Sequence, residues 1–260
     1  MSQTPQIFTG SGNLVGHRGM GKGVVDGHVE NTVGSVLAAL DAGIRWIEVD
    51  VRRTLDDKLF VAHDAAFADG SFVAQLSGRQ ASRHGALHIH ELLEALPDGA
   101  GVVFDVKSSM EDAGRPAAAT TAALLAREGR RFLGDRPVVA MSFDPAALRH
   151  MREQLPGLPL GLLTWLRFPV GQAVAAAAHL DVQVLALHAG SLWPNAVTAP
   201  VDMPALQRVV AHVHESSRQL IVWCPTLEQS LSLVAADVDA LVVDDVPRQV
   251  QTLGRASKAR

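Results

Sequence analysis

Three carboxylic acids in apolar surroundings are the residues of this chain best suited to chemistry. Glu48 and Asp50 lie in residues 45–51 (RWIEVDV), which predict a strand that places both acids on one face, together with Trp46. Asp105 lies near the end of another apolar run, residues 101–106. Buried carboxylates repel one another and lose solvation, and a hard divalent cation with oxygen ligands relieves both effects. The three acids therefore predict a site for Ca²⁺ or Mg²⁺, and an exposed edge strand with solvated acids is the alternative.

Basic side chains occur at the ends of the same and neighbouring strands. His17 and Arg18 end the first predicted strand, and His63 ends a later one. Lys107 lies two positions after Asp105 and therefore on the same face. Histidine titrates near neutral pH and can act as acid or base, while a cation with Arg and Lys suits a phosphate group and the charge that develops on it. This set of side chains favours phosphodiester cleavage.

Strands and helices alternate along the chain, which is typical of βα units on a parallel sheet. The predicted strands are residues 14–16, 44–51, 59–62, 101–106, 137–141, 159–163, 182–187, 219–223 and 240–243. The turn 54–57 is too short for a crossover helix, so strand 59–62 should pair with 44–51 as a hairpin. Residues 65–87 are interpreted as loop. We predict a (β/α)₈ TIM barrel, of class α/β, with one extra hairpin strand at the catalytic rim; an open doubly wound sheet is the alternative.

The length of 260 residues suits one barrel domain, and the 48% hydrophobic content allows a large core. We expect residues 13–254 to form this domain, residues 1–12 to be a flexible leader and residues 255–260 a polar tail. In such a barrel, reactive side chains lie at the C-terminal ends of the strands. His188 and Trp223 also end predicted strands, which makes both candidates for contact with substrate.

Charge and composition exclude several classes of partner. The net charge of −4 gives no basic face for nucleic acid. The single cysteine, Cys224, excludes an internal disulfide and fits a reducing compartment. Residues 1–12 lack the apolar stretch of a signal peptide, and no apolar run is long enough for a membrane span. We therefore expect a cytoplasmic protein with a small-molecule substrate and no stable membrane anchor; the oligomeric state stays open.

Several blocks of residues, in order along almost the whole chain, resemble the glycerophosphodiester phosphodiesterase family. They are Gly16-His17-Arg18-Gly19, Glu30-Asn31-Thr32, Glu48-Val49-Asp50-Val51, Thr54, Asp56, Val61-Ala62-His63-Asp64, Phe104-Asp105-Val106-Lys107, Ser142-Phe143-Asp144, Val222-Trp223-Cys224-Pro225 and the closing segment 242–247. The resemblance implies a phosphatidylinositol-phosphodiesterase-like TIM barrel with a divalent metal. It also implies cleavage of glycerophosphodiesters to glycerol phosphate and an alcohol.

The resemblance assigns roles to individual residues. It implies that His17 and His63 are the catalytic acid–base pair. It implies that Glu48, Asp50 and Asp105 hold the metal, which is expected to be Ca²⁺ or Mg²⁺.

The remaining assignments concern the substrate. By resemblance Arg18 binds the phosphate, Lys107 contacts the phosphate or its ligands, and Trp223 forms a wall on the glycerol side. Asp105 replaces the glutamate that the family usually has, an exchange also similar to the related sphingomyelinase D phospholipases. Pro225 replaces a polar turn residue.

Two other functions remain open. One is a phospholipase D-like phosphodiesterase for lysophospholipid or sphingolipid head groups, which would need an apolar rim around the site. Such a rim could come from Leu162, Trp165, Leu166, Phe168, Leu192 and Trp193. The other is a non-enzymatic barrel that binds a phosphorylated metabolite, which the presence of both histidines and all three acids disfavours.

Two further interpretations are structural. Glu30 and Asn31 precede a predicted helix, so they are either a helix cap or part of the site. Cys224 has no evident histidine partner in the sequence, and we interpret it as a small buried residue and not as a nucleophile.

Overall fold

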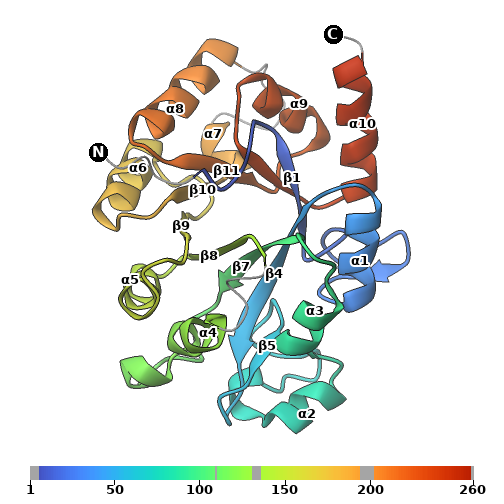
Figure 1. The fold of residues 1–260 in the computed structure, drawn as a ribbon, viewed down its shortest axis with the longest axis vertical. Helices are drawn as coiled ribbons and strands as arrows, with labels where there is room; N and C mark the ends of the chain where they lie inside the picture. Colours follow the sequence, from blue (N-terminus) through green and yellow to red (C-terminus); the bar gives the residue numbers. More distant parts are fainter. Residues whose placement is uncertain (1–5, 109, 131–135, 194–201, 259–260) are drawn as a thin grey trace.

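The structure is a computed structural model that describes residues 6–108, 110–130, 136–193 and 202–258, with backbone only from residue 255 onward. Eight parallel strands close into a barrel, with the helices around it (Figure 1). The strands are β1 (Asn13–His17), β4 (Trp46–Arg53), β7 (Gly101–Val106), β8 (Val138–Ser142), β9 (Leu160–Leu163), β10 (Val184–His188), β11 (Gln219–Trp223) and β12 (Ala240–Val243). Pairing of β1 with both β12 and β4 closes the barrel. The predicted TIM barrel is confirmed.

The predicted hairpin strand lies outside the barrel. β5 (Leu59–Val61) pairs antiparallel with the far end of β4, where Val51 faces Val61, and β6 (Leu87–His88) extends this sheet. The interpretation of residues 65–87 as loop is wrong in part, because they include α2 (Gly78–Arg83) and a 3-10 turn (Val73–Gln75). Ser77 is the N-cap of α2, and its backbone N–H and its hydroxyl donate to the side-chain oxygen of Gln80. With six residues, α2 is too short to show a helical repeat of apolar positions.

The remaining helices follow the strands as the alternation predicts, except that the short helix Ala189–Leu192 lies in a stretch predicted to be loop. They are α1 (Val33–Asp41), α3 (Ile89–Ala95), α4 (Thr121–Gly129), α5 (Pro145–Gln154), α6 (Val170–His179), α7 (Ala189–Leu192), α8 (Met203–Glu215), α9 (Leu227–Ala235) and α10 (Val246–Lys258). Thr32 caps α1 and Asp144 caps α5, each accepting a hydrogen bond from a backbone N–H in the first turn. None of the described helices has both the length and the apolar character that a bilayer crossing requires.

Alternating side chains of the strands supply two separate hydrophobic cores. Those that point outward pack against the helices, and those that point inward fill the barrel. Trp46 is the first residue of β4 and fills the barrel interior at the N-terminal ends of the strands. It lies two positions before Glu48 and on the same face of β4. Gly101 makes room for it, because a Cβ at that position would lie 2.4 Å from the indole ring.

The segment expected to be a flexible leader is packed from residue 6 onward. Phe8 is fully buried in the barrel interior, where its ring centroid lies 4.7 Å from that of Trp46. The side-chain oxygen of Gln219 accepts hydrogen bonds from the backbone N–H groups of Ile7 and Phe8. Residues 6–12 therefore belong to the domain, while residues 1–5 lie outside the described part. At the other end, α10 continues to Lys258, past the expected boundary at 254.

The contact of Trp46 with Gly101 gives a stability prediction. Gly101→Ala should destabilise the protein by about 1–3 kcal/mol, because the new methyl group overpacks the interior against the indole. Gly157→Ala is the matched control, since a Cβ at that position would have nothing within 4 Å. Urea unfolding of the parent and both variants measures the difference. Equal midpoints for the parent and Gly101→Ala would contradict the packing described.

Candidate active site

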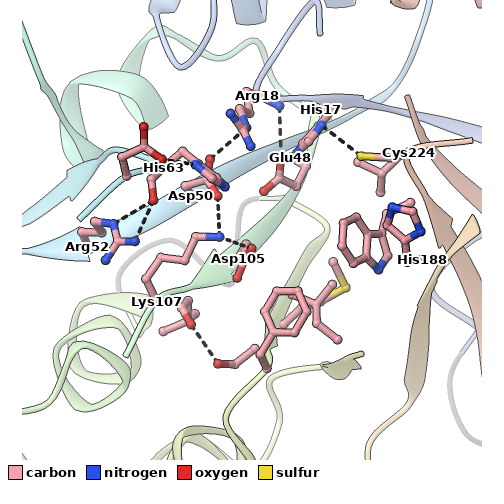
Figure 2. A pocket seen from close by; sticks show the side chains of 18 of the residues that line it. His17, Arg18, Glu48, Asp50, Arg52, His63, Asp105, Lys107, His188 and Cys224 are labelled. Carbon is pink, nitrogen blue, oxygen red and sulfur yellow. Dashed lines mark hydrogen bonds and ion pairs between the residues drawn. The ribbon is translucent and has the colours of Figure 1, made fainter. Parts of the chain in front are cut away.

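A cavity of about 700 Å³ opens at the C-terminal ends of the barrel strands. Every site residue predicted from the sequence lines it, and Figure 2 labels all of these side chains except Trp223. They are His17, Arg18, Glu48, Asp50, His63, Asp105, Lys107, His188 and Trp223. The structure thus brings together residues that are as much as 206 positions apart in the chain (17 to 223).

The three acids form one buried cluster at the base of the cavity. Glu48 and Asp50 come from β4, and Asp50 lies directly across from Asp105 of β7 in the sheet register. Each can place an oxygen within 4.8 Å of the others. Oδ1 of Asp105 is buried and has no hydrogen-bond partner. A buried, unsatisfied oxygen in an all-carboxylate donor set fits a hard divalent cation, so these residues meet the requirement for such a site.

Most of the cationic and polar groups near the cluster contact Asp50. The Lys107 ammonium lies 2.8 Å from Oδ1 of Asp50 and also contacts Asp105. Arg18 Nε lies 3.4 Å from Oδ2 of Asp50, and the Asn31 amide donates to the same oxygen. Although burial raises the pKa of Asp50, these cations outweigh it and hold that pKa at about 2.

The other two acids receive less compensation. Burial, together with the charge of Asp50, raises the pKa of Glu48 to about 8. Burial also raises the pKa of Asp105, and the neighbouring Lys107 only partly offsets it. A bound cation would stabilise all three carboxylates in the charged form.

His17 lies between this cluster and Asp244, a carboxylate of the closing segment 242–247 to which the sequence interpretation assigned no role. Its Nε2 is 3.8 Å from Oε2 of Glu48, and its Nδ1 is 2.5 Å from Oδ1 of Asp244. Burial of the ring lowers the pKa of His17, but the hydrogen bonds with Asp244 and Cys224 and the charge of Glu48 together outweigh it, and the pKa lies well above 6.5. The same bond lowers the pKa of Asp244 against the effect of burial. Asp244 thereby fixes which ring nitrogen faces the cavity.

His63 reaches the cavity from the loop after the hairpin strand β5. Its Nδ1 lies 2.7 Å from Oδ1 of Asp64. Its backbone carbonyl accepts two hydrogen bonds from the buried guanidinium of Arg52, at 2.9 and 2.7 Å. Arg52 is itself ion-paired with buried Glu111. The barrel strand β4 therefore holds the loop that carries His63, whose side chain remains 39% exposed.

The turn after β1 positions Arg18. Its backbone adopts a positive φ of 55°, and its N–H donates to Oε2 of Glu48 at 3.0 Å. The turn is tight enough that a Cβ at Gly16 would lie 2.0 Å from the carbonyl oxygen of Gly19. The guanidinium of Arg18 is ion-paired with Glu30 at 2.8 Å.

Glu30 and Asn31 were expected either to cap the helix or to belong to the site. The helix cap is Thr32, whose hydroxyl accepts from the N–H of Ser35. Glu30 instead contacts Arg18, and Asn31 contacts Asp50. Both side chains therefore support the site and do not cap the helix.

Aromatic side chains form the opposite wall of the cavity. Trp223 meets His188 edge-on, with ring centroids 4.4 Å apart, and Phe143 stacks on Trp165 at 4.2 Å. Burial lowers the pKa of His188, which favours the neutral ring. Phe143 and Trp165 were not among the predicted site residues, although Phe143 belongs to a quoted motif and both follow barrel strands.

The apolar rim considered for a lipid substrate is smaller than the sequence suggested. Trp165 is 62% exposed and Leu166 is 57% exposed. Leu162 is buried on the outer face of the barrel, where it belongs to the core beneath the helices. The other three candidates, Phe168, Leu192 and Trp193, are partly buried and pack against that same core.

The interpretation of Cys224 as a small buried residue without a histidine partner is wrong. It is partly exposed in the cavity, and its Sγ lies 3.8 Å from Nδ1 of His17. The sequence signal available was position alone, since Cys224 and Asp244 each directly follow a barrel strand. Their proximity to His17 depends on closure of the barrel between β1, β12 and β11.

A protein-family profile identifies the family of this chain. The profile of the glycerophosphoryl diester phosphodiesterase family matches residues 17–248. The chain belongs to this family. The matched range contains every barrel strand except the first residues of β1, together with all the residues of the site. The identification from sequence motifs as a glycerophosphodiester phosphodiesterase is confirmed. None of the curated proteins gives a significant match.

Three phosphodiesterases of known structure have a fold similar to that of this chain. A glycerophosphodiester phosphodiesterase from Parabacteroides distasonis is 19% identical, with 96% of this chain and 99% of that chain covered and a TM-score of 0.72. A phosphodiesterase from Oleispira antarctica, in complex with the product sn-glycerol-3-phosphate, is 19% identical, with coverage of 94% and 97% and a TM-score of 0.71. One from Thermotoga maritima is 17% identical, with coverage of 96% and 98% and a TM-score of 0.70. These likenesses establish the shared fold.

The bond between Asp244 and His17 gives a prediction about pH. In metal-free protein, Asp244→Asn should lower the pKa of His17, because the ring keeps its burial and loses the charged acceptor. An NMR titration of the His17 ring measures this. Asp245→Asn is the control, since Asp245 accepts from the N–H of Arg248 at the start of α10. An unchanged pKa in Asp244→Asn would contradict the assigned cause.

The same bond should appear in the pH dependence of stability. A raised histidine pKa stabilises the fold below the unfolded value of about 6.5, and a lowered aspartate pKa stabilises it above about 4. The stability lost in Asp244→Asn should therefore be largest between these two values. It should shrink as pH rises through the folded pKa of His17. Unfolding in denaturant at a series of pH values measures the loss.

Proposed function

We propose that this site hydrolyses glycerophosphodiesters in a metal-dependent reaction in which His17 and His63 exchange protons with the substrate. The observation that carries the proposal is the placement of the two histidines. His17 lies beside Glu48, and His63 lies on the side of Asp50, so the buried acids separate them (Figure 2). A phosphodiester at the acid cluster would therefore have a titratable ring available on either side. The sn-glycerol-3-phosphate bound to the Oleispira antarctica protein supports the substrate class.

Glu48, Asp50 and Asp105 would hold the metal, and the all-oxygen donor set supports Ca²⁺ or Mg²⁺ over zinc. When bound, a divalent cation supplies positive charge to the phosphate and lowers the pKa of an oxygen ligand. Arg18 and Lys107 would add charge from the protein side, and both line the cavity beside Asp50. Guanidinium and ammonium groups stabilise the charge that develops on phosphate oxygens.

The attacking group is proposed to be the substrate hydroxyl on the carbon next to the ester carbon. One histidine takes the proton of this hydroxyl as its oxygen bonds to phosphorus. The other gives a proton to the departing alcohol as the ester bond breaks. The product is a five-membered cyclic phosphate, which water then opens to glycerol phosphate. Attack within one molecule gains several kcal/mol, on the order of 7–11 in favourable cases, from proximity.

The aromatic wall would receive the part of the substrate next to the phosphate. Trp223 and His188 face the cavity together, and Trp223 can pack its ring against the carbons of glycerol. A lysophospholipid or sphingolipid substrate has less support, because only two of the six candidate rim residues, Trp165 and Leu166, are well exposed, and the other four are buried or pack against the core. The non-enzymatic alternative has no support from the geometry, since all the acid, base and cationic groups converge on one cavity.

Removal of either histidine should reduce turnover strongly. His17→Ala and His63→Ala should each lower kcat by about 10²–10⁴-fold, the usual contribution of an acid or base. Both should still bind metal. His63→Ala should melt near the parent temperature, whereas His17→Ala also loses the bond with Asp244 and should melt somewhat lower. His179→Ala, at an exposed position at the end of α6, is the control and should turn over as the parent does. A His17 or His63 variant with more than about half of the parent rate would remove that residue from the proposed pair.

The choice of nucleophile has its own test. A substrate analogue with hydrogen in place of the attacking hydroxyl should bind, and it should not be cleaved at a useful rate. Competition against the normal substrate measures its binding, and phosphorus NMR measures its cleavage. With the normal substrate, the same NMR experiment should show a transient cyclic phosphate. Equal turnover of analogue and substrate would make water the attacking group.

A further inference from the structure

A second group of potential metal ligands lies beside the acid cluster, on the opposite side of the His17 ring. Nδ1 of His17 lies 2.5 Å from Oδ1 of Asp244 and 3.8 Å from Sγ of Cys224. All three ligand atoms lie within 4.8 Å of one another. They come from the ends of three adjacent strands, β1, β12 and β11. This group offers nitrogen, sulfur and oxygen, whereas the acid cluster offers oxygen alone.

The donor set selects a different kind of cation. Zinc takes Cys sulfur, His nitrogen and Asp oxygen at about 2.0–2.3 Å, which separates tetrahedral ligands by about 3–4 Å. The distance between Cys224 and His17 already lies in that range. The shorter distance between His17 and Asp244 is that of a hydrogen bond, and it would lengthen when a metal replaces the shared proton. Ca²⁺ and Mg²⁺ disfavour sulfur, so they would stay at the acids.

The backbone holds the ligands in place and leaves the group accessible. The N–H of Cys224 donates to the carbonyl of Val242 at 2.9 Å, and its positive φ of 53° turns the chain at the strand end. Asp244 directly follows β12, and its side chain is 39% exposed. Both side chains line the cavity. An ion can therefore enter, and three protein ligands leave a coordination position for water.

We propose that His17, Cys224 and Asp244 form an inhibitory site for zinc or another thiophilic divalent cation, separate from the acid cluster. Binding forms bonds from the metal to Nδ1, Sγ and Oδ1, and the thiol proton and the Nδ1 proton go to solvent. His17 can then no longer gain and lose protons freely, so turnover falls. Binding does not depend on the proposed catalytic role of His17, whereas inhibition does.

Cobalt(II) reports on the binding directly. A thiolate bound to Co²⁺ gives a strong near-ultraviolet charge-transfer band, and Cys224 is the single cysteine of the chain. Co²⁺ added to the parent, with saturating Mg²⁺ and a non-thiol reductant, should produce this band at one equivalent, and Zn²⁺ should remove it. Cys224→Ser should show no band. Asp50→Asn, which changes the acid cluster, should keep it. No band in the parent would overturn the site.

Activity then tests the consequence of binding. Zn²⁺ should inhibit the parent at saturating Mg²⁺. Cys224→Ser should need at least about tenfold more Zn²⁺ for the same fractional loss of its own zinc-free rate, because even changes to residues that only support a metal ligand typically cost about 10–100-fold in affinity. Equal sensitivity of parent and variant would overturn the inhibitory role. A cobalt band in the parent without inhibition by zinc would also overturn the inhibitory role. In that case the metal site would stand, and the proposed catalytic role of His17 would be wrong. Melting of Cys224→Ser without zinc controls for folding.

Discussion

The burial of three like-charged side chains at the mouth of the barrel is the constraint on which the rest of the site depends. Glu48, Asp50 and Asp105 are almost completely inaccessible to solvent. Such a group is unstable in a low-dielectric interior unless cations or protons compensate it. Lys107 and Arg18 compensate Asp50, and they leave Glu48 and Asp105 with raised pKa values. The cluster therefore retains unmet affinity for positive charge, which is the property that a phosphodiesterase site of this kind requires.

The two histidines are held by different parts of the fold. His17 belongs to the barrel wall, where Asp244 fixes its ring from behind. His63 lies on the hairpin loop, which Arg52 ties to β4 through the His63 carbonyl. One ring is thus rigidly placed and the other lies on a more exposed segment. This arrangement suits the proposed reaction, in which the cavity admits a substrate and the two histidines exchange protons with it from either side.

Much of the site was predictable because its residues obey local rules. Alternation along β4 placed Glu48 and Asp50 on one face, and the parallel pairing of β4 with β7 places Asp105 opposite Asp50. The short α2 was missed because six residues show no helical period, and Phe8 was missed because its burial depends on the barrel interior. Asp244 and Cys224 could not be assigned from sequence for a similar reason. Their contacts with His17 exist only once β1 pairs with β12. Asp244 is 227 positions from His17 in the chain, and Cys224 is 207 positions from it.

Calorimetric titration of Mg²⁺ and Ca²⁺ into chelated protein, alongside turnover of a glycerophosphodiester, shows whether the buried acids hold a cation that the reaction needs. We expect binding of one ion, and turnover that is abolished by chelation and restored by that ion. Asp50→Asn should weaken both while the fold is retained. Asp69→Asn, on a loop outside the cavity, should change neither. Full turnover in thoroughly chelated protein, or equal affinity in Asp50→Asn, would contradict the assignment of the buried acids as a cation site.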